Sequence, residues 1–301
     1  MYGDERVTNQ EIIMKTIDLH THTTYSDGTD TLDEILKHVR EEGIDLFSVT
    51  DHDSIRAGIE MPWLLEDRPK EQRPAFIRGI EFSCRDELGK YHILGYGFDP
   101  QVPGIADVVS KGHGLRMKKT RARLEFLKEK FGFSFPPEEI KELLARDNPG
   151  KPHIANLMVK HGYANSISQA ITEYIDKKKF QNVHVRPEEA IGGILKSGGI
   201  PVLAHPAYGD GDDLILGEEL EERIRYLMGY GIAGLEAYYS GFSPKIISQA
   251  LELAEKYGLY VTAGSDYHGH NKMVDLGWTN LDDLSEAPKG LTNFLENVEI
   301  I

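Results

Sequence analysis

The stretch Thr16-Ile17-Asp18-Leu19-His20-Thr21-His22 places two histidines at the end of a short strand pattern. Alternate side chains of an extended strand point to the same face, so His20 and His22 can both reach one metal ion. A polar turn follows, and Asp27 in that turn adds a carboxylate. The stretch therefore predicts a strand whose carboxyl end carries ligand-type side chains.

Outward from this strand, strand patterns alternate with helix patterns along the chain. A helix is expected to open near Thr31, with an apolar stripe of leucine, isoleucine and valine, and to end at Gly43. Such alternation predicts βα units and a parallel sheet or barrel, so the expected fold class is α/β. Further strands are expected at 46–49, 75–82, 91–96, 201–204, 234–238 and 260–263, and further helices from 186 and over 214–229 and 244–257.

Residues 104–185 have a different character, because they are helical, basic in places and poor in strand signals. We therefore expect a discontinuous barrel domain formed by 15–103 and 186–301, with 104–185 as a mostly helical insertion or cap. The length of 301 residues is sufficient for this organisation.

Composition limits the possible partners. Acidic residues outnumber basic ones by 49 to 34, and the net charge of −15 makes extended coating of nucleic acid unfavourable. The single cysteine, Cys84, excludes an internal disulfide and an all-cysteine zinc site. No apolar run approaches the roughly 20 residues of a membrane span, and no secretory signal is seen, which predicts a cytoplasmic protein. The oligomeric state and the role of residues 1–14, which can be an overhang or precede a start at Met14, stay open.

Ligand-type side chains recur at six strand ends, and the carboxyl ends of parallel strands meet on one face of such folds. Burying many imidazoles and carboxylates together is costly unless cations accompany them. Neutral imidazole and carboxylate are preferred ligands of zinc, manganese and iron. The eleven side chains are His20, His22, Asp27, Asp51, His52, Asp53, Glu81, His92, His205, Asp266 and His268.

Four motifs resemble those of the PHP domain, the polymerase and histidinol phosphatase family. They are Asp18-Leu19-His20-Thr21-His22 with Ser26-Asp27-Gly28, Thr50-Asp51-His52, Ala204-His205-Pro206 and Gly264-Ser265-Asp266-Tyr267-His268. The resemblance covers about 16–103 and 186–285, and implies a distorted (β/α)7 TIM-like barrel that holds two or three divalent ions, manganese, iron or zinc.

The resemblance also implies how the ligands are shared. His20, His22, Glu81 and Asp266 would bind the first ion, Glu81 would bridge to a second ion with His92 and His205, and Asp27, His52 and His268 would bind a third. Asp51 is expected to orient a neighbouring imidazole instead of binding an ion.

The expected cap narrows the resemblance further. Gly150-Lys151-Pro152-His153-Ile154-Ala155 is similar to the cap segment of PHP phosphoesterases that act on small nucleotides, including 3',5'-nucleoside bisphosphate phosphatases, although those usually have arginine at the position of Lys151. Arg116, Lys119 and Arg123 share one helical face. These three residues, Lys151 and His153 are candidates to hold the non-reacting part of a substrate, or form a solvated basic face. Tyr238 can stack on a base or simply pack.

The expected reaction is metal-assisted hydrolysis of a phosphate ester by hydroxide derived from bound water. The substrate would be a small nucleotide or ribose phosphate, with nucleoside 3',5'-bisphosphates and the 5' ends of short oligonucleotides as examples. Asp266 is expected to be essential for catalysis, and His153 is a candidate acid for the leaving group.

Other functions stay open. Within the family, histidinol-phosphate phosphatase is the main alternative, and a polymerase-type exonuclease is a lesser one. An amidohydrolase also starts with a His-x-His strand, but commonly adds a lysine at a strand end. A metal-bound regulatory module without catalysis is the alternative outside enzymes.

Overall fold

The fold is built on one sheet in which the strands follow chain order. The computed structural model describes residues 15–70, 73–181, 183–209 and 213–301. The question of residues 1–14 lies outside the described residues. Neighbouring strands pair in the order β1-β2-β3-β4-β5-β6-β7. The strands are β1 Ile17–Asp18, β2 Leu46–Val49, β3 Ala75–Arg85, β4 Lys90–Tyr96, β5 Ile200–Leu203, β6 Gly234–Tyr239 and β7 Tyr260–Gly264.

The sheet curls into a nearly closed barrel, which confirms the expected fold class. β4 runs antiparallel to both β3 and β5 and is the main distortion, because all other neighbouring pairs are parallel. The first and last strands meet where the Leu19 amide donates to the Ala263 carbonyl at 2.9 Å. Gly264 permits this approach, since a Cβ there would overlap the side chains of His20 and Glu236.

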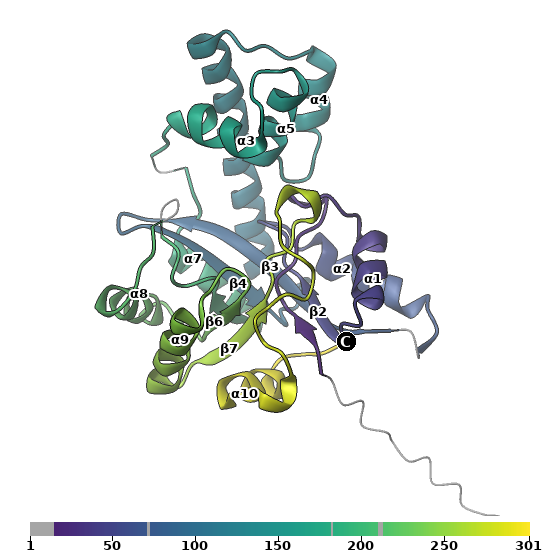
Figure 1. Ribbon diagram of the computed structural model, residues 1–301, viewed down its shortest axis with the longest axis vertical. Coiled ribbons are helices and arrows are strands. Elements are labelled where there is room, and N and C mark those ends of the chain that lie inside the picture. The colour runs from purple at the N-terminus through teal and green to yellow at the C-terminus, as the bar shows by residue number, and fades with distance from the viewer. Residues whose placement is uncertain (1–14, 71–72, 182, 210–212) are drawn as a thin grey trace, which may run out of the picture.

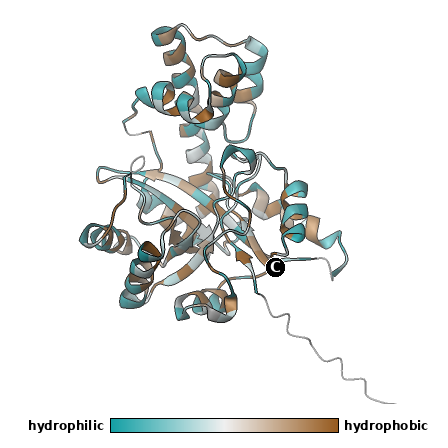
Figure 2. Cartoon of the chain, viewed as in Figure 1, coloured by the Kyte–Doolittle hydropathy of each residue, from teal (hydrophilic) through white to brown (hydrophobic). Residues whose placement is uncertain are grey.

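Amphipathic helices cover the outside of the barrel (Figures 1 and 2). α1 begins at a capping box, in which Thr31 accepts from the Glu34 amide and Glu34 accepts from the Thr31 amide. α2 was not predicted, and it carries Pro62 in its interior. The helices around the barrel are α1 Leu32–Glu41, α2 Arg56–Glu66, α7 Pro187–Lys196, α8 Glu218–Met228, α9 Pro244–Tyr257 and α10 Lys289–Asn297.

The long helix α3 (Pro103–Phe131) leads from the barrel to a separate helical layer (Figure 1). That layer has its own apolar cluster, which includes Leu127, Ile154 and Met158. It contains α4 Pro137–Leu144, α5 Lys151–Lys160, α6 Ile167–Gln169, the π-helix η2 Ala170–Tyr174 and the short η3 Ile175–Lys177. We call this layer the cap; the expected domain limits at 104 and 185 stay a prediction.

Candidate metal centre

The structure brings the nine expected metal ligands together at one face of the barrel, seven from segments that follow strands and two from within strands. His20 and His22 follow β1, His52 follows β2, and Glu81 and His92 lie on β3 and β4. Three more of the nine, His205, Asp266 and His268, follow β5 and β7, and Asp27 comes from the turn after β1. We call these nine residues the ligand cluster. Segments separated by more than 200 residues in sequence thus contribute to one buried polar site.

Glu81 lies at the centre of the cluster and is 1% exposed. Its Oε1 lies 2.6 Å from His92 Nδ1, and its Oε2 lies 2.9 Å from His52 Nδ1. Neither oxygen accepts a hydrogen bond from any residue that the structure describes. Ring nitrogens of five histidines lie within 3.4 Å of this carboxylate, namely those of His20, His22, His52, His92 and His205.

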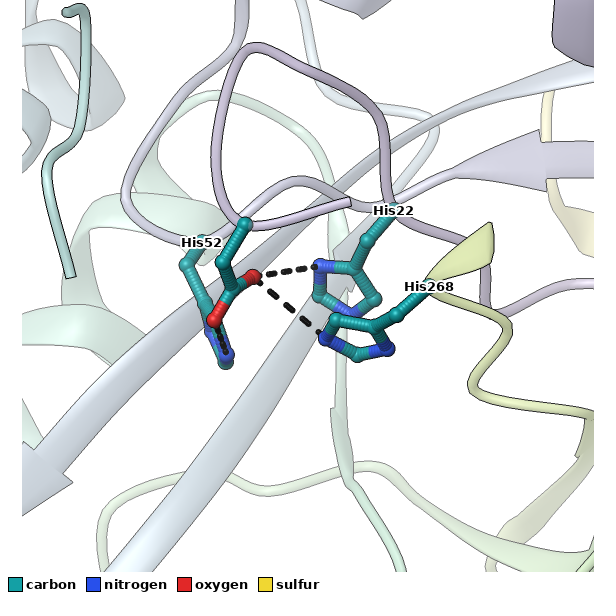
Figure 3. Close-up of side chains that lie close together, drawn as sticks. His22, His52 and His268 are labelled. Atoms are coloured by element: carbon teal, nitrogen blue, oxygen red, sulfur yellow. Dashed lines mark ion pairs between the residues drawn. The ribbon is translucent and has the colours of Figure 1, made fainter. Parts of the chain in front are cut away.

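A second carboxylate, Asp27, forms ion pairs with three imidazoles, those of His22, His52 and His268, which are labelled in Figure 3. Its Oδ1 lies 3.3 Å from His268 Nε2 and 3.9 Å from His22 Nδ1, and its Oδ2 lies 3.9 Å from His52 Nε2. The Oδ1 atom is buried and has no hydrogen-bond partner among the described residues. Three imidazoles therefore face one carboxylate at distances that leave room for a shared cation.

The charges of the cluster are strongly coupled. Burial would raise the pKa of Glu81, but His52, His92 and His20 hold the pKa well below its usual range. Burial would lower the pKa of His20, but the carboxylates of Glu236, Glu81 and Asp266 raise it well above its usual value. The cluster therefore favours ionised carboxylates with positive charge close to them.

The donor set fits divalent cations, because unpartnered carboxylate oxygens and imidazole nitrogens converge on common points. Ligand atoms of three groups lie within 4.8 Å of one another: His22, Asp27, His52 and His268; His20, His22 and Glu81; and His52, Glu81 and His92. The grouping resembles the expected sharing of ligands, and Glu81, His22 and His52 each belong to two groups. Asp266 and His205 stand next to these groups, since Asp266 Oδ1 is 3.3 Å from His22 Nε2 and His205 Nε2 is 3.4 Å from Glu81 Oε1.

Buried carboxylates outside the cluster orient its imidazoles. Glu236 on β6 lies 2.8 Å from His20 Nδ1 and accepts from the His205 amide at 2.7 Å. Because a carboxylate only accepts, His20 donates through Nδ1, so Nε2 is the nitrogen that faces the cluster and would bind an ion in the neutral form of the ring. Asp51 accepts from the Ser26 hydroxyl, which lies 3.3 Å from His22 Nδ1. The expected orienting role fits Asp51, whereas Glu236 was missed, although an acid inside an apolar strand pattern was a signal.

Backbone strain is concentrated at the same strand ends. His205 has φ of 28° and Asp266 has φ of 60°, and Asp53 beside His52 has φ of 52°. Residues other than glycine rarely adopt such values, and they persist where the surroundings hold them for a function. The strain therefore agrees with a site built around these side chains.

A pocket of about 370 Å³ opens onto the ligand cluster. Tyr239, not Tyr238, lines it. The register shift on β6 between Glu236 and Tyr238 inserts Ala237 as an extra residue, so Tyr239 takes the inward position that simple alternation gives to Tyr238. Tyr238 packs against the main apolar core instead. Tyr238 therefore packs, which is one of the two outcomes left open for it, and stacking on a substrate by Tyr239 stays a prediction.

Arg116, Lys119 and Arg123, which we call the cation row, follow one another along α3. Arg116 is already engaged, because its Nε donates to Asp53 Oδ2 at 3.0 Å and its Nη2 donates to Ser83 Oγ at 3.1 Å. This engagement makes the expected substrate contact by Arg116 less favourable.

Arg123 and Lys119 are less well paired. Arg123 is 8% exposed, lies over the Phe180 ring at 5.2 Å and has no partner for its Nε among the described residues. Burial, followed by the charge of Arg116, lowers the pKa of Lys119 to about 7. Among the described residues, neither side chain forms an ion pair with an acid, although Asp176 acts on Arg123 and Asp53 acts on Lys119 from a distance.

Lys151 and His153 open α5 on the cap side. Lys151 pairs with Asp176 at 2.6 Å. His153 Nδ1 accepts from the Gly150 amide at 2.9 Å, which leaves Nε2 as a donor. Burial lowers the pKa of His153 to about 4, so the imidazole is neutral near pH 7. His153 can donate a hydrogen bond to a substrate, but this pKa disfavours the expected role as leaving-group acid, which stays a prediction.

Residues 18–287 match the PHP domain. The chain belongs to the PHP domain family. The match spans the barrel and the cap, so it agrees with the resemblance that the four motifs predicted.

Several characterised relatives of this PHP chain act on phosphate esters. The chain is 29% identical over 259 residues to a phosphoribosyl 1,2-cyclic phosphate 1,2-diphosphodiesterase of Eggerthella lenta, with 84% of this chain and 94% of the relative covered. It is 27% identical to a 5'-3' exoribonuclease of Salmonella typhimurium, with 90% of each covered. It is also 27% identical to a 3',5'-nucleoside bisphosphate phosphatase of Chromobacterium violaceum, with 85% of this chain and 88% of the relative covered.

Two solved structures share the fold. A protein from Bifidobacterium adolescentis, whose own assignment as a metal-dependent phosphoesterase is a prediction, is 25% identical, with a TM-score of 0.78 and 94% and 96% of the two chains covered. A protein from Chromobacterium violaceum described as an amidohydrolase, with bound sulfate and no metal, is 25% identical, with a TM-score of 0.79 and 93% and 96% covered.

Family membership and these relatives make the chain a hydrolase of phosphoric ester bonds and a metal-dependent phosphoesterase. The relatives act on small phosphorylated substrates, and some act on RNA. Within the described residues, no helix is long and apolar enough to cross a membrane.

Proposed function

We propose that this PHP protein removes phosphate from small nucleotides that carry a second anionic group, with nucleoside 3',5'-bisphosphates as the leading substrates. The observation that supports the proposal is the cation row along α3, which starts at Arg116 in contact with Asp53 and continues to Lys119 and Arg123, outside the residues that line the pocket. The reacting phosphate would lie at the cluster, and the second anionic group would lie against Lys119 and Arg123.

The ligand cluster would hold two or three ions of manganese, iron or zinc. His20, His22, Glu81 and Asp266 suit one ion, Glu81, His92 and His205 a second, and Asp27, His52 and His268 a third. Bound divalent cations supply Lewis-acid polarisation of phosphoryl oxygens and lower the pKa of coordinated water.

The chain's own residues would orient and bind. Glu236 fixes the tautomer of His20 through its 2.8 Å contact with Nδ1, and the pair Asp51 and Ser26 does the same for His22. Neutral His153 would donate a hydrogen bond through Nε2 to a substrate oxygen. Tyr239 would form the wall of the pocket against which a sugar or base rests.

The cations under the cap favour a substrate with a second negative group. A buried cation without a partner is unfavourable, and a bound anion relieves that cost. Lys119 lies one helical turn from Arg116 and Arg123 two turns, so both are displaced from the cluster along α3. Such a displacement suits a second phosphate on the same molecule, and it disfavours histidinol phosphate, whose amine is cationic.

The 5' end of a short RNA is a second candidate. It also presents a phosphate close to a further phosphate, and the exoribonuclease relative matches this chain over 90% of both lengths. The net charge of −15 still argues against binding to long nucleic acid outside the pocket.

A substrate panel tests the proposal. The protein loaded with manganese, iron or zinc is assayed with nucleoside 5'-monophosphates, 3',5'-bisphosphates, histidinol phosphate and short 5'-phosphorylated RNA. We expect a higher kcat/KM for the bisphosphates than for the monophosphates, and loss of activity with a chelator. Equal kcat/KM for mono- and bisphosphates would contradict the second anionic subsite, and failure to hydrolyse any phosphate ester would contradict the proposed function.

A further inference from the structure

Lys272, which the sequence analysis did not place at the site, lies in the loop after β7 and contacts Asp266. Lys272 follows Asp266 by six residues and comes directly after the short helix η4 (Gly269–Asn271). The loop folds back toward the cluster, because the Asn271 side chain donates to the Asp27 carbonyl at 2.8 Å and the His270 amide donates to Thr29 Oγ1 at 3.0 Å. These contacts direct Lys272 toward the pocket, which it lines.

Asp266 divides its two carboxylate oxygens between the cluster and Lys272. Oδ1 lies 3.4 Å from His20 Nε2 and 3.3 Å from His22 Nε2. Oδ2 accepts from Lys272 Nζ, and it also accepts from the Tyr239 hydroxyl at 2.9 Å. The contact with Lys272 therefore leaves the oxygen that faces the imidazoles available to an ion.

The ammonium group has one donor left after these contacts. Lys272 Nζ donates to Asp266 Oδ2 and, at 2.9 Å, to the Tyr239 hydroxyl, and a lysine ammonium has three N–H groups. The side chain is 33% exposed, so it is held at two points and still open to the pocket. A fixed cation with a free donor beside a phosphate site is suited to bind a phosphoryl oxygen.

We propose that Lys272 donates its remaining N–H to a non-bridging oxygen of the phosphoryl group bound at the ligand cluster. This inference rests on the proposed function, because it assigns a contact within the same site. It places a fixed positive charge beside the ions, on the side of the pocket formed by Asp266 and Tyr239. The phosphate itself, not the nucleoside, is the group recognised.

Binding of inorganic phosphate to metal-loaded protein tests this contact without requiring turnover. We expect Lys272→Met to weaken the calorimetric phosphate affinity by about 10- to 100-fold at saturating metal, the range of a charge-assisted hydrogen bond. Lys272→Arg should recover part of the affinity, because it restores the charge. Lys37→Met removes the same charge from a side chain on α1 that is 67% exposed, and should leave the affinity unchanged.

Two further variants and measurements separate phosphate binding from orientation of Asp266. Tyr239→Phe removes a hydrogen bond to Asp266 and to Lys272 but keeps the charge, so we expect a smaller loss than for Lys272→Met. Metal content is measured for each variant at the concentrations used. A phosphate affinity of Lys272→Met within twofold of the wild type at full metal loading would overturn the proposal, whatever the metal affinity. Absence of phosphate ester hydrolysis by the wild type would contradict the proposed function instead.

Discussion

The ligand cluster at the barrel face and the cation row under the cap carry buried charges of opposite sign. At the barrel face, Glu81 is surrounded by imidazoles of five histidines and neither of its oxygens has a proper hydrogen bond. Under the cap, Arg123 is buried with an unpartnered Nε. The first region needs cations and the second needs an anion. Under the proposed function, metal ions would balance the charge of the first region and an anionic group of the substrate that of the second.

Removal of a carboxylate from the barrel face should have the largest effect. We expect Asp266→Ala to lower kcat by more than about 1000-fold and to reduce the metal content, because one ligand oxygen is lost. Asp275→Ala, an exposed acid in the same loop, is the matched control and should keep activity and metal. Full activity of Asp266→Ala in steady-state assays would contradict a catalytic role for the ligand cluster.

Glu236→Gln tests the support behind the barrel face. A glutamine side chain has a single acceptor oxygen. It therefore cannot replace both contacts of the Glu236 carboxylate, one with His20 Nδ1 and one with the His205 backbone N–H. We expect metal affinity to fall about 10- to 100-fold, the range for carboxylates that orient metal-bound histidines. Titration of each variant with the metal ion in a calorimeter measures this affinity. Glu221→Gln on α8 serves as control, and an unchanged metal affinity in Glu236→Gln would show that the contact is dispensable.

Lys119→Met tests whether the cation row under the cap binds the second phosphate of the substrate. We expect kcat/KM to fall about tenfold for a bisphosphate and to stay within twofold for a monophosphate, because only the second phosphate loses a partner. Lys118→Met changes the exposed neighbour on the same helix and should alter neither value. Equal losses for both substrates would mean that Lys119 does not distinguish them.

A small pH effect should come from the same lysine. Burial, with the charge of Arg116, lowers the pKa of Lys119 to about 7, so the ammonium is charged below that pH and neutral above it. The ratio of kcat/KM for bisphosphate to that for monophosphate should therefore fall a few-fold between about pH 6 and pH 8. Because both substrates would react at the same metal centre, titration of its residues changes both kcat/KM values and cancels in their ratio. Lys119→Met should show a flat ratio, and a ratio that rises with pH in the wild type would contradict the assignment.

The sequence predicted the barrel correctly, because strand and helix patterns are local, while metal binding by the nine clustered residues stays a prediction. Ligand-type residues at strand ends, such as His20, His205 and Asp266, follow directly from the strand assignment. Of the two outcomes left open for Tyr238, packing is the one observed, and the bulge at Ala237 that places Tyr239 at the pocket is not visible in the sequence. α2 was missed because Pro62 interrupts its pattern. Lys272 was missed because a loop, not a strand, brings it back to Asp266.

Contacts across the fold explain the other differences. The distance between Glu236 and His20 in sequence is 216 residues, and no local pattern pairs them. The contact between Arg116 and Asp53, 63 residues apart in sequence, likewise appears only in the folded chain. Residue types with ligand chemistry are thus visible in the sequence, whereas the groups that orient or neutralise them require the fold.

Anomalous diffraction from crystals of the full chain grown with manganese tests the central claim most directly. The account predicts at least two anomalous peaks within bonding distance of the ligand cluster, with Glu81 contacting more than one of them. Crystals that show the nine side chains in the same arrangement, at saturating manganese, with no anomalous peak among them would contradict it.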